Sequence, residues 1–91
     1  MTELSERIDE LRARIGENDR AIVAGVNERL RLVAELWALK DAQGTDRLDP
    51  DRERRLREEL AAANDGPLTG DGLHRLVTEL LALTKRELGP G

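Results

Sequence analysis

Residues 4–40, LSERIDELRARIGENDRAIVAGVNERLRLVAELWALK, decide the fold. Apolar side chains recur in this stretch at steps of three, four or seven residues, the spacing that keeps them on one face of a helix. These apolar residues are Leu4, Ile8, Leu11, Ile15, Ile22, Val26, Val33 and Leu36. No proline occurs from about Thr2 to Ala42. We therefore predict one helix of about forty residues, roughly 60 Å long.

Two cations, Arg29 and Lys40, lie on the same line as these apolar residues. They are separated by about three helical turns, so their side chains point within roughly 20° of each other. Burying a cation without a partner costs free energy, and a negatively charged ligand would remove that cost. The pattern therefore predicts an anion-binding site on the inner face of the helix. The alternative is that both side chains lay their apolar stems on the core and extend their charges into water.

The rest of the chain predicts two shorter helices. Residues 43–46 have the composition of a helix stop and loop, and Asp49 followed by Pro50 is typical of an N-cap with proline in the first turn. The second helix then runs to Ala63, and the Asn-Asp-Gly-Pro sequence of residues 64–67 ends it.

A third helix is expected after a cap at Thr69 or Asp71. Its inner side would carry Leu73, Leu76, Val77, Leu80, Leu81, Thr84 and Leu88. Residues 89–91, Gly-Pro-Gly, would follow as a short frayed tail. The predicted fold class is all-α, with one long and two shorter helices in a single domain spanning residues 1–91.

Composition excludes several classes of function. The net charge of −4 and the single aromatic residue, Trp37, argue against a nucleic-acid-binding protein. The chain has no apolar run long enough to cross a membrane and no signal-peptide pattern, so we expect a soluble, cytoplasmic protein. Because the chain has no cysteine and only one histidine, His74, we expect a surface histidine and no metal site.

The long first helix predicts a homodimer. The second and third helices together are only about as long as the first, so part of its apolar stripe would remain in water in a monomer. A second copy laid antiparallel against the first would bury both stripes in a shared, intertwined core. Trp37 is expected to pack near that seam. By contrast, Arg54, Arg55 and Arg57 are expected to form a solvated face paired with Glu58 and Glu59.

Four segments together resemble a known family, the all-helical class of chorismate mutases. They are L-R-A-R-I from Leu11, E-R at Glu28 and Arg29, Lys40, and D-P-D-R-E from Asp49 to Glu53. Their spacings equal those of the bacterial enzymes, and the resemblance covers most of the chain. It implies that chorismate rearranges to prephenate by a pericyclic shift, without proton transfer, covalent intermediate or cofactor.

The resemblance also implies roles for particular residues. Arg12, donated by the neighbouring subunit, and Arg29 would bind the substrate carboxylates with help from Arg52. Lys40 would face the ether oxygen and a carboxylate. Glu53, helped by the backbone around Asp49, would accept a hydrogen bond from the ring hydroxyl of the substrate.

The residue at position 53 bears on the alternatives. Relatives that act as isochorismate pyruvate lyases or as 4-amino-4-deoxychorismate mutases usually carry an apolar residue there. Glu53 therefore favours chorismate as the substrate, with those two activities kept as alternatives.

The third helix departs from the family pattern. Thr84 and Leu88 fall where the best-known enzymes place a serine and a glutamine that donates to the ether oxygen. The leucine side chain cannot donate a hydrogen bond. The neighbouring Glu87 could donate one to the ether oxygen only if its carboxyl group were protonated. A non-catalytic helical adaptor with a decayed pocket is thus a further alternative.

The C-terminal segment K-R-E-L-G, Lys85 to Gly89, resembles the ending of short actinobacterial chorismate mutases. Those enzymes are weak alone and are activated by docking to DAHP synthase, the first enzyme of the shikimate pathway. The resemblance therefore implies low intrinsic activity that such a partner raises.

Overall fold

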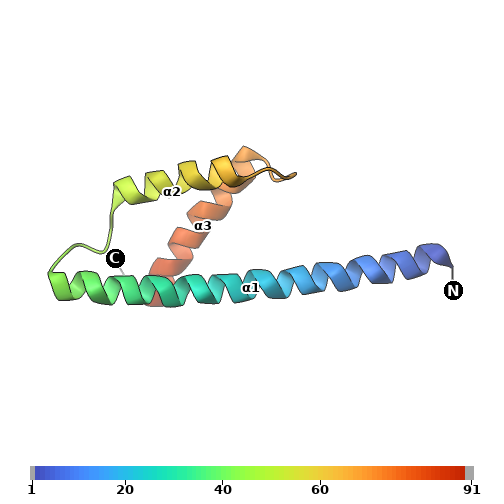
Figure 1. The fold of residues 1–91 in the computed structure, drawn as a ribbon, viewed down its shortest axis with the longest axis horizontal. Coiled ribbons are helices and arrows are strands. Elements are labelled where there is room, and N and C mark those ends of the chain that lie inside the picture. The colour runs from blue at the N-terminus through green and yellow to red at the C-terminus, as the bar shows by residue number, and fades with distance from the viewer. Residues whose placement is uncertain (1, 90–91) are drawn as a thin grey trace. The chain divides into compact units, whose positions relative to one another are not determined.

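The computed structural model describes residues 2–89, and every regular element in that range is a helix. The helices are α1 (Glu3–Gln43), α2 (Pro50–Ala63) and α3 (Gly70–Leu88), as Figure 1 shows. The predicted all-α fold with one long and two shorter helices is confirmed. Pro90 and Gly91, on which the expected frayed tail depends, lie outside the described residues. The chain divides into two compact units, Met1–Leu32 and Val33–Gly91.

The first unit consists of the N-terminal three-quarters of α1. Thr2 caps the helix, because its side-chain oxygen accepts a hydrogen bond from the Ser5 N–H at 3.1 Å. The helix continues without a break through Gly16 and Gly25, as its ribbon in Figure 1 shows. Within this unit no other element covers the apolar stripe. Its exposed members are Leu4, Ile8, Leu11, Ile15 and Ile22, with exposures between 41% for Leu11 and 77% for Leu4.

The end of α1 is built by backbone hydrogen bonds around one glycine. Gly44 has a φ of 71°, a left-handed conformation that favours glycine. Its N–H donates to the Asp41 carbonyl at 3.1 Å, and the Thr45 N–H donates to the Lys40 carbonyl at 2.9 Å. This pair of bonds is the Schellman arrangement, which ends a helix and turns the chain away from its axis.

The predicted start of α2 is confirmed. Asp49 is the N-cap, and its carboxylate accepts from the Arg52 N–H at 3.1 Å, while Pro50 occupies the first helical position. At the other end, Asn64 is the C-cap, and its side chain donates to the Leu68 carbonyl at 2.9 Å. That bond organises the short loop leading to α3.

Thr69, one of the two residues expected to cap α3, is its N-cap and accepts from the Gly72 N–H at 3.0 Å. The buried residues of α3 are Leu73, Val77 and Thr84, and Val77 is 1% exposed. Leu76, predicted on the inner side, is 49% exposed, so that expectation is wrong. Leu76 lies about 100° from Val77, at the border of the apolar face.

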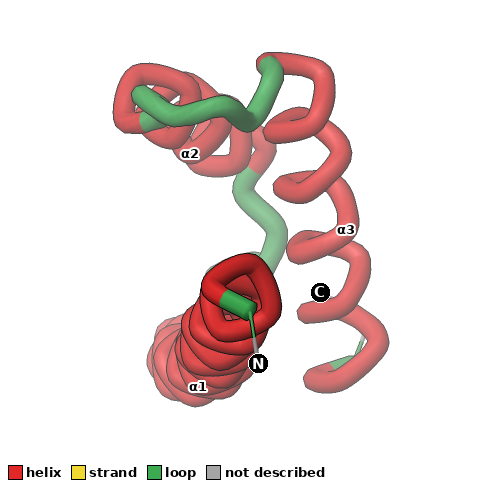
Figure 2. Tube along the Cα trace, turned by 90° about the vertical axis from the view of Figure 1, so that its right-hand side faces the viewer, coloured by secondary structure: helices red, strands yellow, loops and turns green. Residues whose placement is uncertain are grey.

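Helix α2 packs against α3 within the second unit, as Figure 2 shows. Among the described residues of this unit, the buried ones are Trp37, near the end of α1, and the three from α3. No described helix combines the length and the apolar character needed to cross a membrane.

Candidate active site

The ammonium group of Lys40 is tied to the loop that leads into α2. Its Nζ donates to the backbone carbonyl of Arg47 at 3.1 Å, and the residue is half-buried. Arg47 lies two residues before Asp49, the N-cap of α2. The contact therefore brings the Lys40 charge to the chain segment from which α2 begins. A lysine ammonium has three N–H donors, so two remain for a ligand.

The side chain of Arg47 folds back onto α1. Its Nε donates to Asp41 Oδ1 at 3.0 Å and its terminal nitrogen donates to Asp41 Oδ2 at 2.6 Å, a two-pronged pairing. The guanidinium carbon also lies 5.1 Å from the centre of the Trp37 ring, within cation–π range. Trp37 and Asp41 are four residues apart on α1 and therefore share a face. We call Trp37, Asp41 and Arg47 the loop clasp.

Hydrogen bonding within the loop clasp shifts the acid–base behaviour of both charged members. The bonds donated by Arg47, and secondarily its positive charge, lower the pKa of Asp41 below its ordinary value, although partial desolvation opposes them. The same hydrogen bonds raise the pKa of Arg47. Both groups are therefore ionised at neutral pH.

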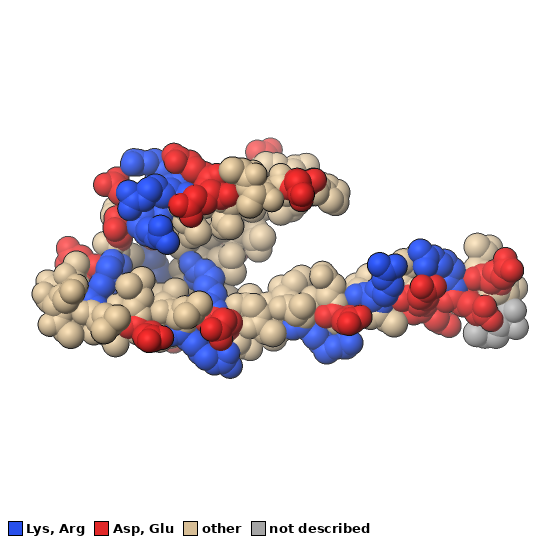
Figure 3. All heavy atoms as spheres, in the orientation of Figure 1, with Lys and Arg blue, Asp and Glu red and all other residues tan. Residues whose placement is uncertain are grey.

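The N-terminus of α2 carries three of the predicted site residues. The Asp49 carboxylate is occupied in capping the helix, and the Glu53 N–H donates to the Asp49 carbonyl at 3.0 Å. Arg52 is exposed, whereas Glu53 is half-buried. Figure 3 shows acidic and basic side chains mingled over this half of α2. Lys40 thus contacts the loop that leads to Asp49, and Arg52 and Glu53 follow in the first turn of α2.

Arg12 and Arg29 belong to the first unit and lie on the same uninterrupted helix. Seventeen positions of α-helix separate them by about 25 Å and by roughly 100° around the axis. Arg12 is exposed and Arg29 is half-buried. Within one copy, these two side chains therefore cannot reach the same small ligand.

Thr84 and Leu88 are one turn apart on the last part of α3. Thr84 is 4% exposed, and its hydroxyl donates to the Leu80 carbonyl of its own helix at 2.7 Å. Leu88 is half-buried and Glu87 is exposed. The Thr84 proton is thus engaged in a hydrogen bond within its own helix.

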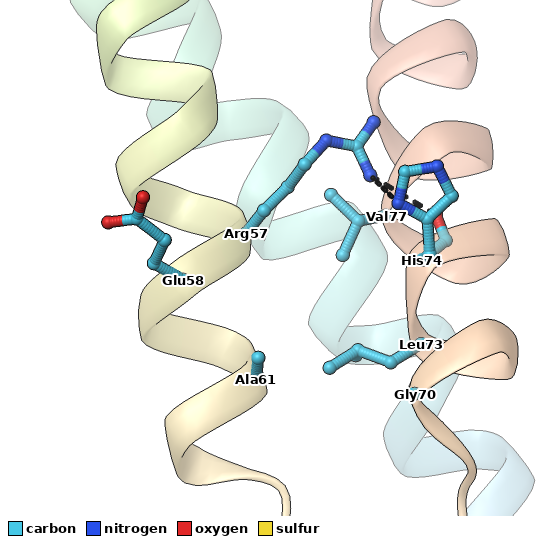
Figure 4. Close-up of a pocket in the computed structure, with 7 residues that line it drawn as sticks. All are labelled: Arg57, Glu58, Ala61, Gly70, Leu73, His74 and Val77. Atoms are coloured by element: carbon cyan, nitrogen blue, oxygen red, sulfur yellow. Dashed lines mark hydrogen bonds between the residues drawn. The ribbon is translucent and has the colours of Figure 1, made fainter.

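A cavity of about 270 Å³ lies between α2 and α3, and none of the predicted site residues is among those that line it (Figure 4). Leu73 and Val77 form its apolar wall. At its rim, the Arg57 guanidinium donates to the His74 carbonyl at 3.3 Å and to Thr78 Oγ1 at 3.0 Å, and it lies 3.2 Å from His74 Nδ1.

The Arg57 contacts correct one expectation. Arg57 is half-buried and bridges two helices instead of forming part of a solvated face. The expectation fails because the helical period shows only neighbours on the same helix, whereas the partners of Arg57 come from α3. Arg54 lies on the exposed face as expected, but its partner is Asp51 at 3.3 Å and not the expected Glu58.

The loop clasp is the feature that sequence reasoning missed. Trp37 is buried, as a packing residue should be, but the role of its partner Arg47 was not predicted. The sequence did contain a signal for it: Trp37 and Asp41 lie one helical turn apart, and a helix-ending glycine, Gly44, and then Arg47 follow them. No group of three or more metal-ligating side chains occurs within the described range of residues.

Comparison with known proteins assigns the fold to a family. Residues 11–87 match the chorismate mutase type II family. A solved structure of chorismate mutase (form II) from Thermus thermophilus is 31% identical in sequence and has a TM-score of 0.83; the match covers 88% of this chain and 91% of that chain. No curated protein matches the sequence.

The chain therefore belongs to the chorismate mutase type II family. The resemblance found in the sequence is confirmed, as are the helical fold and the assignment to an isomerase class. The matched span includes Arg12, Arg29, Lys40 and Arg52 and ends one residue before Leu88.

Proposed function

We propose that this chain rearranges chorismate to prephenate in one pericyclic step. A carbon–carbon bond forms as the ether carbon–oxygen bond breaks, and no proton is transferred. The enzyme must hold a dicarboxylate in a compact conformation and stabilise the negative charge that grows on the ether oxygen. The observation that carries the proposal is the family match over residues 11–87, which contains all four of the predicted cations.

Lys40 is the proposed donor to the ether oxygen. Its ammonium is half-buried and held by one backbone carbonyl at 3.1 Å, so two N–H groups are free to point at a substrate. A cation fixed before the reaction stabilises developing charge without reorganising. A second role for the same ammonium is to bind one carboxylate.

The remaining polar groups are proposed to bind the substrate. Arg29 and Arg52 bind carboxylates, because a guanidinium presents two parallel donors to a carboxylate. Glu53 accepts the ring hydroxyl, together with the backbone at Asp49. A carboxylate at position 53 favours chorismate over its isochorismate and amino analogues.

Arg12 is proposed to act in the site of a second copy. It lies about 25 Å along the helix from Arg29, too far to share a ligand within one chain. The stripe of exposed apolar residues in the first unit supports an antiparallel homodimer, because a second copy would cover it. In this proposal residues 1–91 form one domain that is complete only as a dimer, working in the cytoplasm.

The ending of α3 supports low intrinsic activity. Leu88 supplies no hydrogen bond, and the Thr84 proton is already bonded to Leu80. Loss of one donor to a developing oxyanion typically costs two to three orders of magnitude in rate. We propose that DAHP synthase binds this enzyme and raises its activity, as the K-R-E-L-G ending suggests.

The central test follows the loss of chorismate ultraviolet absorbance. Wild-type protein should consume chorismate, and Lys40→Ala and Arg29→Ala should each lower kcat/KM by about a hundredfold or more. Arg54→Ala, which removes an arginine from the exposed face of α2, should leave it unchanged. If wild type and all variants are equally inert, with and without added DAHP synthase, the adaptor alternative holds. Pyruvate release from isochorismate would identify a lyase instead.

Two further measurements test the assembly. Sedimentation equilibrium should give the mass of a dimer, and a monomer mass independent of concentration would reject the shared site. Titration of DAHP synthase into the turnover assay should raise kcat/KM. An unchanged value at saturation would remove the synthase from the proposal.

A further inference from the structure

Arg47 touches the proposed catalytic lysine through its backbone and the body of α1 through its side chain. Its carbonyl accepts from Lys40 Nζ at 3.1 Å, while its guanidinium grips Asp41 and lies over Trp37. These contacts all lie within the second unit. One residue therefore links the position of the Lys40 ammonium to a fixed face of the helix.

The backbone of the loop alone does not fix this carbonyl. The Schellman bonds end at Thr45, and the next backbone anchor is the cap at Asp49. Between them, the chain is irregular from Asp46 to Leu48. Besides the bond that its carbonyl accepts from Lys40, Arg47 ties this stretch to α1 through its side chain, whose bidentate pairing with Asp41 restricts both distance and orientation.

The exposure of the ion pair indicates what it contributes. The side chains of Arg47 and Asp41 are 31% and 49% exposed, and ion pairs that open to water contribute little to folding stability. A bidentate pair stacked on a buried tryptophan still restricts geometry. We therefore expect the Arg47–Asp41 pair to affect the position of Lys40 more than the stability of the fold.

We propose that Arg47 is a positioning residue: with Asp41 and Trp37 it holds the loop so that its own carbonyl aims the Lys40 ammonium at the substrate. The inference rests on the proposed role of Lys40. Misplacing a catalytic group by about 1 Å can cost up to a hundredfold in rate. Loss of the clasp should therefore lower kcat more than it raises KM.

The test is a double-mutant cycle on the full chain, assayed by chorismate consumption. Arg47→Ala should lower kcat by about tenfold in the wild-type background and by less than twofold in a Lys40→Ala background, because Arg47 acts only through Lys40. Asp41→Asn should lower kcat in the same way as Arg47→Ala in both backgrounds. Arg54→Ala, the matched loss of an exposed arginine, should have no effect in either background.

Three outcomes would overturn the inference. If Arg47→Ala leaves kcat unchanged while Lys40→Ala is damaging, the positioning role fails and the proposed function stands. An equal loss in both backgrounds would mean that Arg47 acts on the fold or the substrate, not through Lys40. If Lys40→Ala is fully active, both the inference and the proposed role of Lys40 fail.

A second readout needs no turnover. A hydrogen-bonded ammonium exchanges its protons slowly with water, so NMR of the ¹⁵Nζ of Lys40 should show a protected signal in wild-type protein and not in Arg47→Ala. Circular dichroism should show the same helix content in both. A signal equally protected in the variant would show that the clasp does not hold Lys40.

Discussion

By the resemblance found in the sequence, Leu88 falls where the best-known chorismate mutases carry a hydrogen-bond donor. It is half-buried at the end of α3, one turn after Thr84. A leucine there cannot donate to an ether oxygen, which is consistent with the low intrinsic activity that we propose. This departure is an expectation from residue type and spacing, and the family match ends at residue 87, one residue before it.

Leu88→Gln should therefore raise the rate. A donor restored at the ether oxygen should increase kcat by about tenfold or more without DAHP synthase, measured by chorismate consumption. Leu76→Gln, at an exposed position on the same helix, is the matched control and should not change kcat. Equal kcat values for Leu88→Gln and wild type would show that position 88 does not reach the reacting oxygen.

Asp41 predicts a dependence of the loop clasp on pH. Hydrogen bonds from Arg47 lower the pKa of Asp41 in the folded protein. The stability that the ionised carboxylate gives to the loop clasp is therefore fully present above the pKa of the unfolded chain, near 4. It is lost as the pH falls through the lower pKa of the folded protein. Trp37, the only tryptophan, reports the change because Arg47 lies over its ring.

In an acid titration, the fluorescence of Trp37 should change with a midpoint below about pH 4. Asp41→Asn should remove this step, whereas Asp51→Asn, which affects the exposed pair with Arg54, should keep it. Circular dichroism at each pH separates the step from general unfolding. A midpoint at or above about 4 would mean that Arg47 does not stabilise the Asp41 carboxylate.

At the scale of the elements, local signals located the helix ends well. The Asp49-Pro50 start, the Thr69 cap and the glycine after α1 act through contacts within a few residues, which a sequence displays directly. Contacts between elements were not predictable in this way. Arg57 and Arg54 look alike in sequence, yet only Arg57 reaches α3, because the packing of α2 on α3 decides which arginine faces it.

Arg57 should accordingly contribute to stability more than its neighbours on α2. Arg57→Ala removes hydrogen bonds to the His74 carbonyl and to Thr78, and should lower the free energy of unfolding by about 1 to 2 kcal/mol. Arg55→Ala, on the exposed face of the same helix, should stay within about 0.5 kcal/mol of wild type. Denaturant unfolding followed by circular dichroism, at one fixed protein concentration, measures both. Equal stability of the two variants would show that the bridge between α2 and α3 contributes nothing.

For the whole molecule, the sequence predicted the helical class and the family, but not how the side chains around the loop after α1 are arranged. The stripe of α1 and the spacing of its cations follow from helical periodicity, which does not describe the loop that brings Lys40 to the start of α2. The loop clasp depends on how residues 44–48 fold back, which periodicity does not describe. The apolar stripe of α1 was expected from the sequence, and in the structure its residues in the first unit are exposed. This exposure is the structural basis for proposing a second copy.

The central claim is that each site combines Lys40 of one copy with Arg12 of another. Mixing the Arg12→Ala and Lys40→Ala proteins under conditions that exchange subunits tests it most directly. Each variant alone should be nearly inert. Half of all dimers would be mixed, each with one intact site, so the mixture should regain about a quarter of the wild-type chorismate mutase activity. A mixture no more active than the average of the two separate proteins would contradict the account.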